Sequence, residues 1–316
     1  MRYIVVLSSR AGGGRLWSVR ELLRASLPER EVSLVVDPSN PVIDSLCRAH
    51  RTEGLRLVAV GGDGTVHRLL TAAARYDVPI GILPHGTAND LARTIGLRRD
   101  IGECCRVIRA DHTRAIDLVA VNGNLFATCG GLGLPSCVAM RCNSCRSLRE
   151  APFARTRLLR RTTYLLTALH ELGRSHSVEV RIDNCGPLYS GRVMAVVFSN
   201  QPRFGVLFSV SPKAVDDDGL LDLCAIPDPG SHLREAGIVL QAALGRGVVL
   251  PGVVRGRLRH AHILTDSVVP FFGDGEILTR DREFKITVLP EAVRMIVPGS
   301  VPAVEIESCA STASWS

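Results

Sequence analysis

The chain of 316 residues lacks any apolar run near the ~18 residues that a membrane-spanning helix requires. Its most apolar stretch, residues 237–254, is interrupted by a glutamine, an arginine and a proline. The first residues hold one arginine and a short apolar run, which does not fit a secretory leader. We therefore expect a cytoplasmic protein that associates peripherally with the membrane.

Lysine and aromatic residues are scarce. Lys213 and Lys285 are the only lysines, so arginine supplies 36 of the 38 basic side chains, and the net charge is +7. A basic protein favours an anionic partner such as a nucleotide or an anionic membrane, although codon usage explains an arginine excess equally well. Aromatic residues make up 4% of the chain, which leaves little for stacking on bases. We expect no nucleic-acid partner.

Ten cysteines are present, but the chain is neither short nor visibly secreted, so a disulfide framework is not expected. Cys142 and Cys145, with Cys137 upstream, have ligand-like spacing. No second cysteine or histidine pair follows to complete a zinc site. We expect reduced thiols that pack as small hydrophobic side chains.

Two patterns divide the chain. Up to residue 117, apolar runs rich in β-branched residues alternate with helical patterns, which indicates a parallel sheet between helices. Beyond it, a hairpin pattern, a helical stretch over 155–172 and many short strands indicate a β-sandwich-like architecture. We predict an α/β domain over 1–117 and a β-rich domain over 118–288, with residues 289–316 free to pack back on the first.

The strongest local signal is a strand that runs into Gly61, Gly62, Asp63, Gly64 and Thr65 before a helical pattern. Ligands bind beyond the carboxyl ends of parallel strands. Glycines let backbone N–H groups approach a polyphosphate, and the start of a helix favours anions. The loop is neither a Walker A loop nor a dinucleotide-binding GxGxxG. An ordinary strand-to-helix turn is the alternative.

A second loop of this kind follows the next strand, with Gly86 and Thr87 at the strand end and Asn89 and Asp90 at the helix start. A third turn, residues 12–14, consists of glycines and follows the first strand. A capped helix start is the simpler explanation of the second loop. Because all three loops would meet at one rim of the sheet, turn chemistry alone does not easily account for them.

Two acidic segments lie far downstream. Asp274 stands between two glycines, where it could point into a cleft and accept a proton, or form the tip of a hairpin turn. Residues 216–222 hold four carboxylates within seven positions. Hard cations such as Mg²⁺ take such oxygen ligands, and a solvated acidic turn is equally compatible with the pattern.

In this order, the motifs resemble those of the soluble bacterial diacylglycerol kinase-like lipid kinases, relatives of diacylglycerol and sphingosine kinases. The matching sequences are GGDGT at 61–65, GTANDLAR at 86–93, DDGLLD at 217–222 and GDGE at 273–276. The resemblance implies an NAD kinase-like α/β nucleotide-binding domain, a C-terminal β-sandwich-like domain, and ATP in the cleft between them. The acceptor would be a hydroxyl of a lipid such as diacylglycerol.

The same resemblance assigns roles to residues. Asp274 would be the general base on the lipid hydroxyl, with Asp63 as the rival base. A structural Mg²⁺ would be held by Asp218 and by backbone carbonyls near Val215 and Leu220, and a second Mg²⁺ would accompany ATP. The nucleotide-binding residues would be Gly12, Gly61, Gly62, Asp63, Gly64, Thr65, Thr87, Asn89, Asp90 and Glu276.

One departure keeps alternatives open. Ser8 and Ser9 stand where the family usually has Asn-Pro, although Gly12 is retained. A non-catalytic nucleotide-binding regulatory protein is therefore one alternative, and an NAD kinase-like small-molecule kinase is another because it shares GGDGT.

A cluster of arginines over residues 141–161 could form a basic amphipathic segment that binds anionic lipid, or a solvated helix packed on the protein. We expect a lipid substrate at an anionic membrane surface as the partner. A homodimer is left open.

Overall fold

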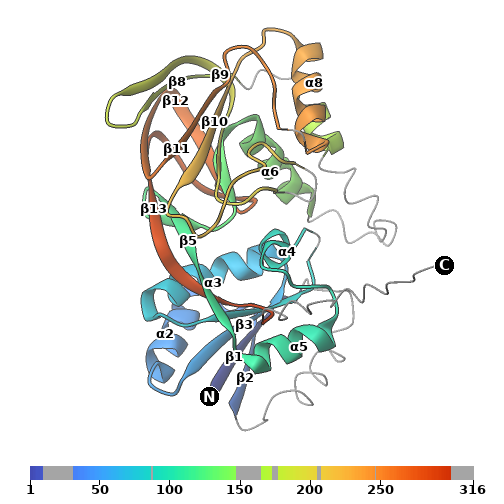
Figure 1. Ribbon diagram of the computed structural model, residues 1–316, viewed down its shortest axis with the longest axis vertical. Helices are drawn as coiled ribbons and strands as arrows, with labels where there is room; N and C mark the ends of the chain where they lie inside the picture. The colour runs from blue at the N-terminus through green and yellow to red at the C-terminus, as the bar shows by residue number, and fades with distance from the viewer. Residues whose placement is uncertain are drawn as a thin grey trace, which may run out of the picture.

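The structure is a computed structural model that describes residues 1–9, 31–86, 88–146, 165–172, 177–204, 208–245 and 247–299. Figure 1 shows two bodies, one above the other. Among the described residues, the lower body holds the N-terminal strands and four helices, and the upper body is dominated by long strands. None of the helices in the described part of the chain is both long and apolar enough to cross a membrane.

The lower body is built on four strands that pair in parallel in the order β2-β1-β3-β4. Every residue of β4 is buried, and so are five of the six residues of β1. Burial on both faces explains why these strands read as unbroken apolar runs rather than as alternating patterns. The strands are β1 (Arg2–Leu7), β2 (Val32–Val36), β3 (Leu55–Gly61) and β4 (Ile80–Pro84).

Helices α2 (Asn40–His50), α3 (Asp63–Tyr76), α4 (Asp90–Thr94) and α5 (Ile101–Ala110) accompany these strands. Helix α3 links β3 to β4 and begins directly at the glycine-rich turn. It buries Val66, Leu69, Leu70 and Ala73, whose spacing places them on one face of the helix. The helix ends at Asp77, which takes a left-handed conformation and donates its N–H to the Ala73 carbonyl. Because α3 begins directly after β3, its amino end lies at the carboxyl end of that strand.

Antiparallel pairing dominates the upper body. Its aromatic core includes Phe126, Phe198, Phe271 and Phe284, all fully buried. Helices α6 (Leu134–Arg146) and α8 (His232–Ala243) cover a second apolar cluster. Strand β5 (Thr113–Val121) starts in the lower body, whose core contains its Ile116 and Leu118, and ends in the upper one (Figure 1). The other strands of the upper body are β6 (Asn124–Phe126), β7 (Cys129–Gly133), β8 (Val178–Asp183), β9 (Pro187–Ser199), β10 (Leu221–Pro227), β11 (Val254–Leu258) and β12 (His260–Gly273).

Strand β13 (Glu276–Ile296) joins the two bodies. It pairs with β12 at its start and with β5 over its second half, and Met295 then pairs in parallel with Ile80 of β4. Figure 1 shows this strand descending from the upper body into the lower one. Thus the chain returns to its N-terminal half before residue 297. The expected boundary at residue 288 falls within this continuous strand, and residues 300–316 lie outside the described ones.

Two tight hairpins in the upper body turn at the residues where the sequence pattern indicates a turn. The turn between β5 and β6 uses Asn122 and Gly123, and the turn between β12 and β13 uses Asp274 and Gly275. All four residues have positive φ, from 46° to 85°, as a two-residue loop with the twist of adjoining strands demands. The predicted hairpin after residue 117 is therefore present, and the Asp274 turn is a hairpin tip.

Cysteines lie in the cores of both bodies. No disulfide joins the cysteines whose side chains the structure describes, and Cys47, Cys104, Cys129 and Cys224 are buried. Burial raises the pKa of the Cys47 thiol to about 11, which keeps it protonated at neutral pH. These residues act as small hydrophobic side chains of the core.

Candidate functional site

The two glycine-rich loops touch each other at the carboxyl ends of β3 and β4. The His85 N–H donates to the Gly61 carbonyl at 2.7 Å. A Cβ atom added to Gly62 would lie 2.9 Å from the Gly86 Cα, closer than side-chain carbons approach backbone. Glycine is required here because the two backbones pack directly against each other. Gly12 and Thr87, also predicted to bind nucleotide, lie outside the described residues.

Asp63 holds the start of α4 in place. Its carboxylate accepts the N–H of Asn89 at 2.8 Å and the N–H of Asp90 at 2.6 Å. Asn89 adopts a left-handed conformation with φ 51°, and its Oδ1 accepts the Gly86 N–H at 2.9 Å. Burial and the neighbouring Asp90 carboxylate raise the pKa of Asp63. Asp63 therefore fixes the second loop against the first, and Arg93 pairs with Asp90 beside it.

Asp274 reaches this site from the other half of the chain. Its carboxylate accepts the Thr128 N–H at 2.8 Å, the Thr128 hydroxyl at 2.7 Å and the Ala127 N–H at 3.1 Å. Its own N–H donates to the Cys129 carbonyl at 3.0 Å. The side chain is only 4% exposed. These contacts fix the orientation of the carboxylate rigidly.

His67 connects the two halves. Its Nδ1 lies 2.9 Å from Asp274 Oδ2, although 207 positions separate them in sequence. Burial lowers the pKa of His67, but the hydrogen bond and charge of Asp274, with a smaller contribution from Glu276, outweigh it and raise the pKa overall. His67 is not among the site residues predicted from the sequence. Its position four residues after Asp63, on the same side of α3, is the signal that could have revealed it.

Glu276 completes this side of the site. Asn143 of α6 donates its amide N–H to Glu276 Oε2 and to the Gly275 carbonyl, both at 3.0 Å. Glu276 Oε1 would lie 3.3 Å from a Cβ atom on Gly64, so the carboxylate sits beside the first glycine-rich loop. The structure therefore gathers nine of the predicted residues at one place. They are Gly61, Gly62, Asp63, Gly64, Thr65, Asn89, Asp90, Asp274 and Glu276.

Both halves of the chain match known protein families. The family model described as "Diacylglycerol kinase catalytic domain" matches residues 2–121, and the model described as "YegS C-terminal NAD kinase beta sandwich-like domain" matches residues 146–297. A Pseudomonas aeruginosa (strain UCBPP-PA14) protein named "Probable lipid kinase YegS-like" is 32% identical over 249 residues, which cover 78% of each chain. The chain belongs to the YegS-like lipid kinase family.

Further similarities are consistent with this assignment. A protein of the same name from Pseudomonas syringae pv. syringae (strain B728a) is 27% identical over 268 residues, covering 84% of this chain and 82% of the relative. A crystal structure titled as a diacylglycerol kinase from Bacillus anthracis str. Sterne superposes with a TM-score of 0.74 at 22% identity. The superposition covers 95% of this chain and 98% of that one. At 22% identity, this structural similarity is evidence for the fold alone.

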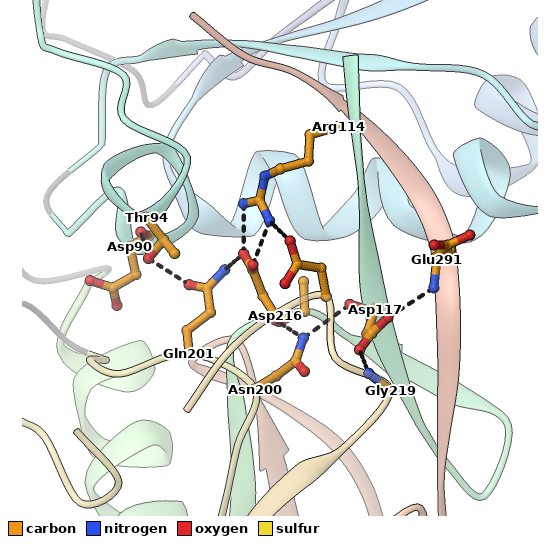
Figure 2. Close-up of polar contacts among 11 residues, drawn as sticks. Asp90, Thr94, Arg114, Asp117, Asn200, Gln201, Asp216, Gly219 and Glu291 are labelled. Carbon is orange, nitrogen blue, oxygen red and sulfur yellow. Dashed lines mark hydrogen bonds and ion pairs between the residues drawn. The ribbon is translucent and has the colours of Figure 1, made fainter. Parts of the chain in front are cut away.

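In this YegS-like chain, the start of the acidic segment over residues 216–222 joins the two bodies. Figure 2 shows Arg114 of β5 paired with Asp216, at 2.7 and 3.1 Å. Gln201 donates to the same carboxylate at 3.4 Å, and its Oε1 accepts the Thr94 hydroxyl at 3.0 Å. Thr94 belongs to α4, so the network continues to the second glycine-rich loop.

Asp117 forms the centre of a second set of contacts. As Figure 2 shows, its carboxylate accepts the Gly219 N–H at 2.7 Å and the Glu291 N–H at 2.8 Å. The Asn200 amide donates to the Asp117 carbonyl at 3.0 Å. These contacts tie β5, the acidic segment and β13 together where the chain passes between its two bodies.

The Mg²⁺ site that the resemblance implies at Val215, Asp218 and Leu220 has a competitor. Asp218 Oδ2 is paired with Arg257, and its Oδ1 accepts the Leu220 N–H at 2.9 Å. Both carboxylate oxygens thus have a donor, and a cation here would face a guanidinium group. No three histidine, cysteine, aspartate or glutamate side chains gather as a metal site among the described residues. The predicted site remains a prediction that requires Arg257 to move aside.

Proposed function

We propose that the protein transfers the γ-phosphoryl group of ATP to a hydroxyl group of a lipid such as diacylglycerol. One observation carries the proposal: the 2.9 Å contact between His67 and Asp274. It brings a carboxylate from the second half of the chain to a histidine beside the glycine-rich loops of the first half. A phosphate-binding loop and a base at one site are what a phosphotransferase with an alcohol acceptor needs.

The loops suit the polyphosphate part of the reaction. Phosphoryl transfer depends on positioning and on neutralising the charge that spreads over the γ-phosphate oxygens. Gly61, Gly62 and Gly64 stand at the amino end of α3, where N–H groups and the helix dipole favour anions. ATP would arrive with a Mg²⁺ ion bound to its phosphates, and that ion would neutralise further charge.

The relatives support a lipid rather than a nucleotide as acceptor. The two curated relatives described above carry lipid kinase in their names. An NAD kinase-like activity remains the second candidate because the family model of the C-terminal half is described as NAD kinase β-sandwich-like.

We also propose that the protein meets its lipid at a membrane surface. Leu233 and Leu240 of helix α8 and Leu244, the residue that caps its carboxyl end, face solvent, with 83%, 51% and 60% of each residue exposed. Their spacing of seven and four residues places them on the face opposite Ile238, Val239 and Ala242, which are buried. An apolar helix face of this kind can insert shallowly among lipid head groups. The predicted arginine cluster lies mostly outside the described residues.

A transfer assay tests the proposed activity. Purified protein is incubated with ATP labelled at the γ-phosphate and Mg²⁺, and with vesicles that contain one lipid alcohol at a time. NAD is offered in a parallel reaction. We expect a labelled phospholipid from at least one lipid alcohol and no labelled NADP. Labelled NADP without labelled lipid would favour the NAD kinase-like candidate, and ATP binding without any transfer would favour a regulatory protein.

A further inference from the structure

We propose that the Nε2 atom of His67, and not the carboxylate of Asp274, takes the proton from the acceptor hydroxyl. Asp274 is then a positioning residue that orients the imidazole ring. This inference rests on the proposed phosphoryl transfer and changes the identity of its general base.

The hydrogen bonds of Asp274 leave it little capacity to bind a substrate hydroxyl. An ionised carboxylate offers about four lone-pair positions. Four donors already approach this one: the Ala127 N–H, which is shared between both oxygens at 3.1 Å, the Thr128 N–H, the Thr128 hydroxyl and the His67 ring. The Asp274 side chain is 4% exposed, whereas the His67 side chain is 19% exposed. Of the two groups, His67 is the one that a substrate can reach.

The same contact sets the tautomer of His67. An ionised carboxylate only accepts hydrogen bonds, so the Nδ1 atom that faces Asp274 carries the hydrogen. In the neutral ring, Nε2 therefore holds a lone pair. No residue in the described part of the chain hydrogen-bonds to His67 Nε2. The lone pair is available to an incoming hydroxyl.

The charges around His67 favour proton uptake. Asp274 and Glu276 face it from the turn that joins β12 to β13, and Asp63 lies one turn earlier on α3. An imidazolium formed during the reaction would be stabilised by the two carboxylates that face it. Together they raise the pKa of His67 against the opposing effect of burial. A general base works best when its pKa lies close to the working pH, and the ordinary pKa of histidine, about 6.5, is the closest to neutral pH among the common side chains.

Proton transfer and phosphoryl transfer occur together. The Nε2 lone pair accepts the hydroxyl proton while the hydroxyl oxygen forms a bond to the γ-phosphorus. The bond between that phosphorus and the β–γ bridging oxygen breaks, and ADP leaves with its electron pair. The imidazolium, held by Asp274, then releases its proton to water.

The decisive variant is His67→Asn. The asparagine amide can replace the Nδ1–H donor towards Asp274, so the carboxylate keeps its partner, but asparagine cannot accept a proton. We expect the transfer rate to fall about 10²- to 10⁴-fold while the affinity for ATP stays within threefold. The limb of the wild-type pH–rate profile that rises above the ordinary histidine pKa should disappear. His262→Asn is the matched control, since His262 forms an exposed pair with Glu283 on β12 and β13.

A measurement without substrate separates this inference from the proposed function. ¹⁵N NMR of labelled histidine side chains reports the tautomer and the titration of His67 directly, with His67→Asn for assignment. We expect the Nδ1–H tautomer and a pKa above the ordinary value, reduced in Asp274→Asn. An Nε2–H tautomer, or a His67→Asn variant with an unchanged rate and pH profile, would overturn the role of His67. A wild-type protein that phosphorylates no lipid would overturn the proposed function instead.

Discussion

Gly62 and Gly86, which follow β3 and β4, pack directly against each other, and neither position has room for a side chain. A Cβ atom on Gly86 would also come within 2.6 Å of Asn89 Oδ1, the atom that closes the second loop on itself. The contact depends on glycine at both positions, and it keeps the two loops in a fixed relation at the rim of the sheet.

Gly86→Ala should therefore separate the loops. We expect a loss of about 1–3 kcal/mol in unfolding free energy, as in other overpacked sites, and at least tenfold weaker ATP binding. Denaturant titration and equilibrium nucleotide binding measure the two effects. Gly237→Ala is the control, because Gly237 lies in α8 with no atom near its added Cβ, and alanine should stabilise that helix by about 0.5–1 kcal/mol. Unchanged nucleotide affinity in Gly86→Ala would contradict the importance of this contact.

Asp274→Asn should leave ATP binding intact and reduce transfer at least 100-fold. The asparagine amide would present a donor to the backbone N–H groups of Ala127 and Thr128, or to the His67 ring, so the geometry of the pair would be lost. Asp281→Asn, an exposed position on β13, is the matched control and should retain full activity. Steady-state transfer assays with separately measured ATP affinity distinguish the effects, and full turnover in Asp274→Asn would remove Asp274 from the mechanism.

The stability of the protein should depend on pH through His67. Its pKa is raised in the folded state above the ordinary value of about 6.5, so the folded state binds the proton more tightly than the unfolded state. This contribution is fully present below pH ~6.5 and is lost as the pH rises through the folded-state pKa. Unfolding free energies of the wild type and His67→Asn should differ more at pH 6 than at pH 9. An equal difference at pH 6 and pH 9 would contradict a raised pKa of His67 in the folded state.

Arg114→Gln should destabilise the junction of the two bodies. The Asp216 side chain is 6% exposed and would lose its ion pair, at a cost of about 1–3 kcal/mol for a buried charged group left with the weaker contact from Gln201. Arg181→Gln removes an exposed pair with Asp183 and should cost less than about 1 kcal/mol. Thermal and denaturant unfolding compare the two. Equal costs would mean that the network shown in Figure 2 does not stabilise the junction.

Leu240→Asp combined with Leu244→Asp should weaken vesicle binding. Charged groups on the exposed face of α8 cannot insert among lipids, so less protein should sediment with anionic vesicles. Transfer to a short-chain lipid dissolved in detergent should remain unchanged. Val268→Asp, at another exposed apolar position on β12, is the control and should bind as the wild type does. Unaltered sedimentation of the double variant would exclude α8 as the membrane contact.

Much of the lower body could be predicted from sequence. Buried parallel strands are apolar throughout, so β1, β3 and β4 stand out in the chain, and the glycine-rich turns after β3 and β4 mark the strand ends that face a ligand. The Asn122-Gly123 and Asp274-Gly275 turns were equally visible, because a two-residue hairpin loop with positive φ selects these residue types.

Contacts between residues far apart in the chain could not be predicted from the sequence in the same way. The sequence alone determined the glycine-rich loops, the hairpin tips and the alternation of strands and helices, because backbone sterics and hydrophobic burial act on neighbouring residues. Only the tertiary structure decided that Asp274 faces His67, that Arg257 pairs with Asp218, and that β13 returns to β4. Each of these pairs residues far apart in the chain, and the fold alone brings their charges together.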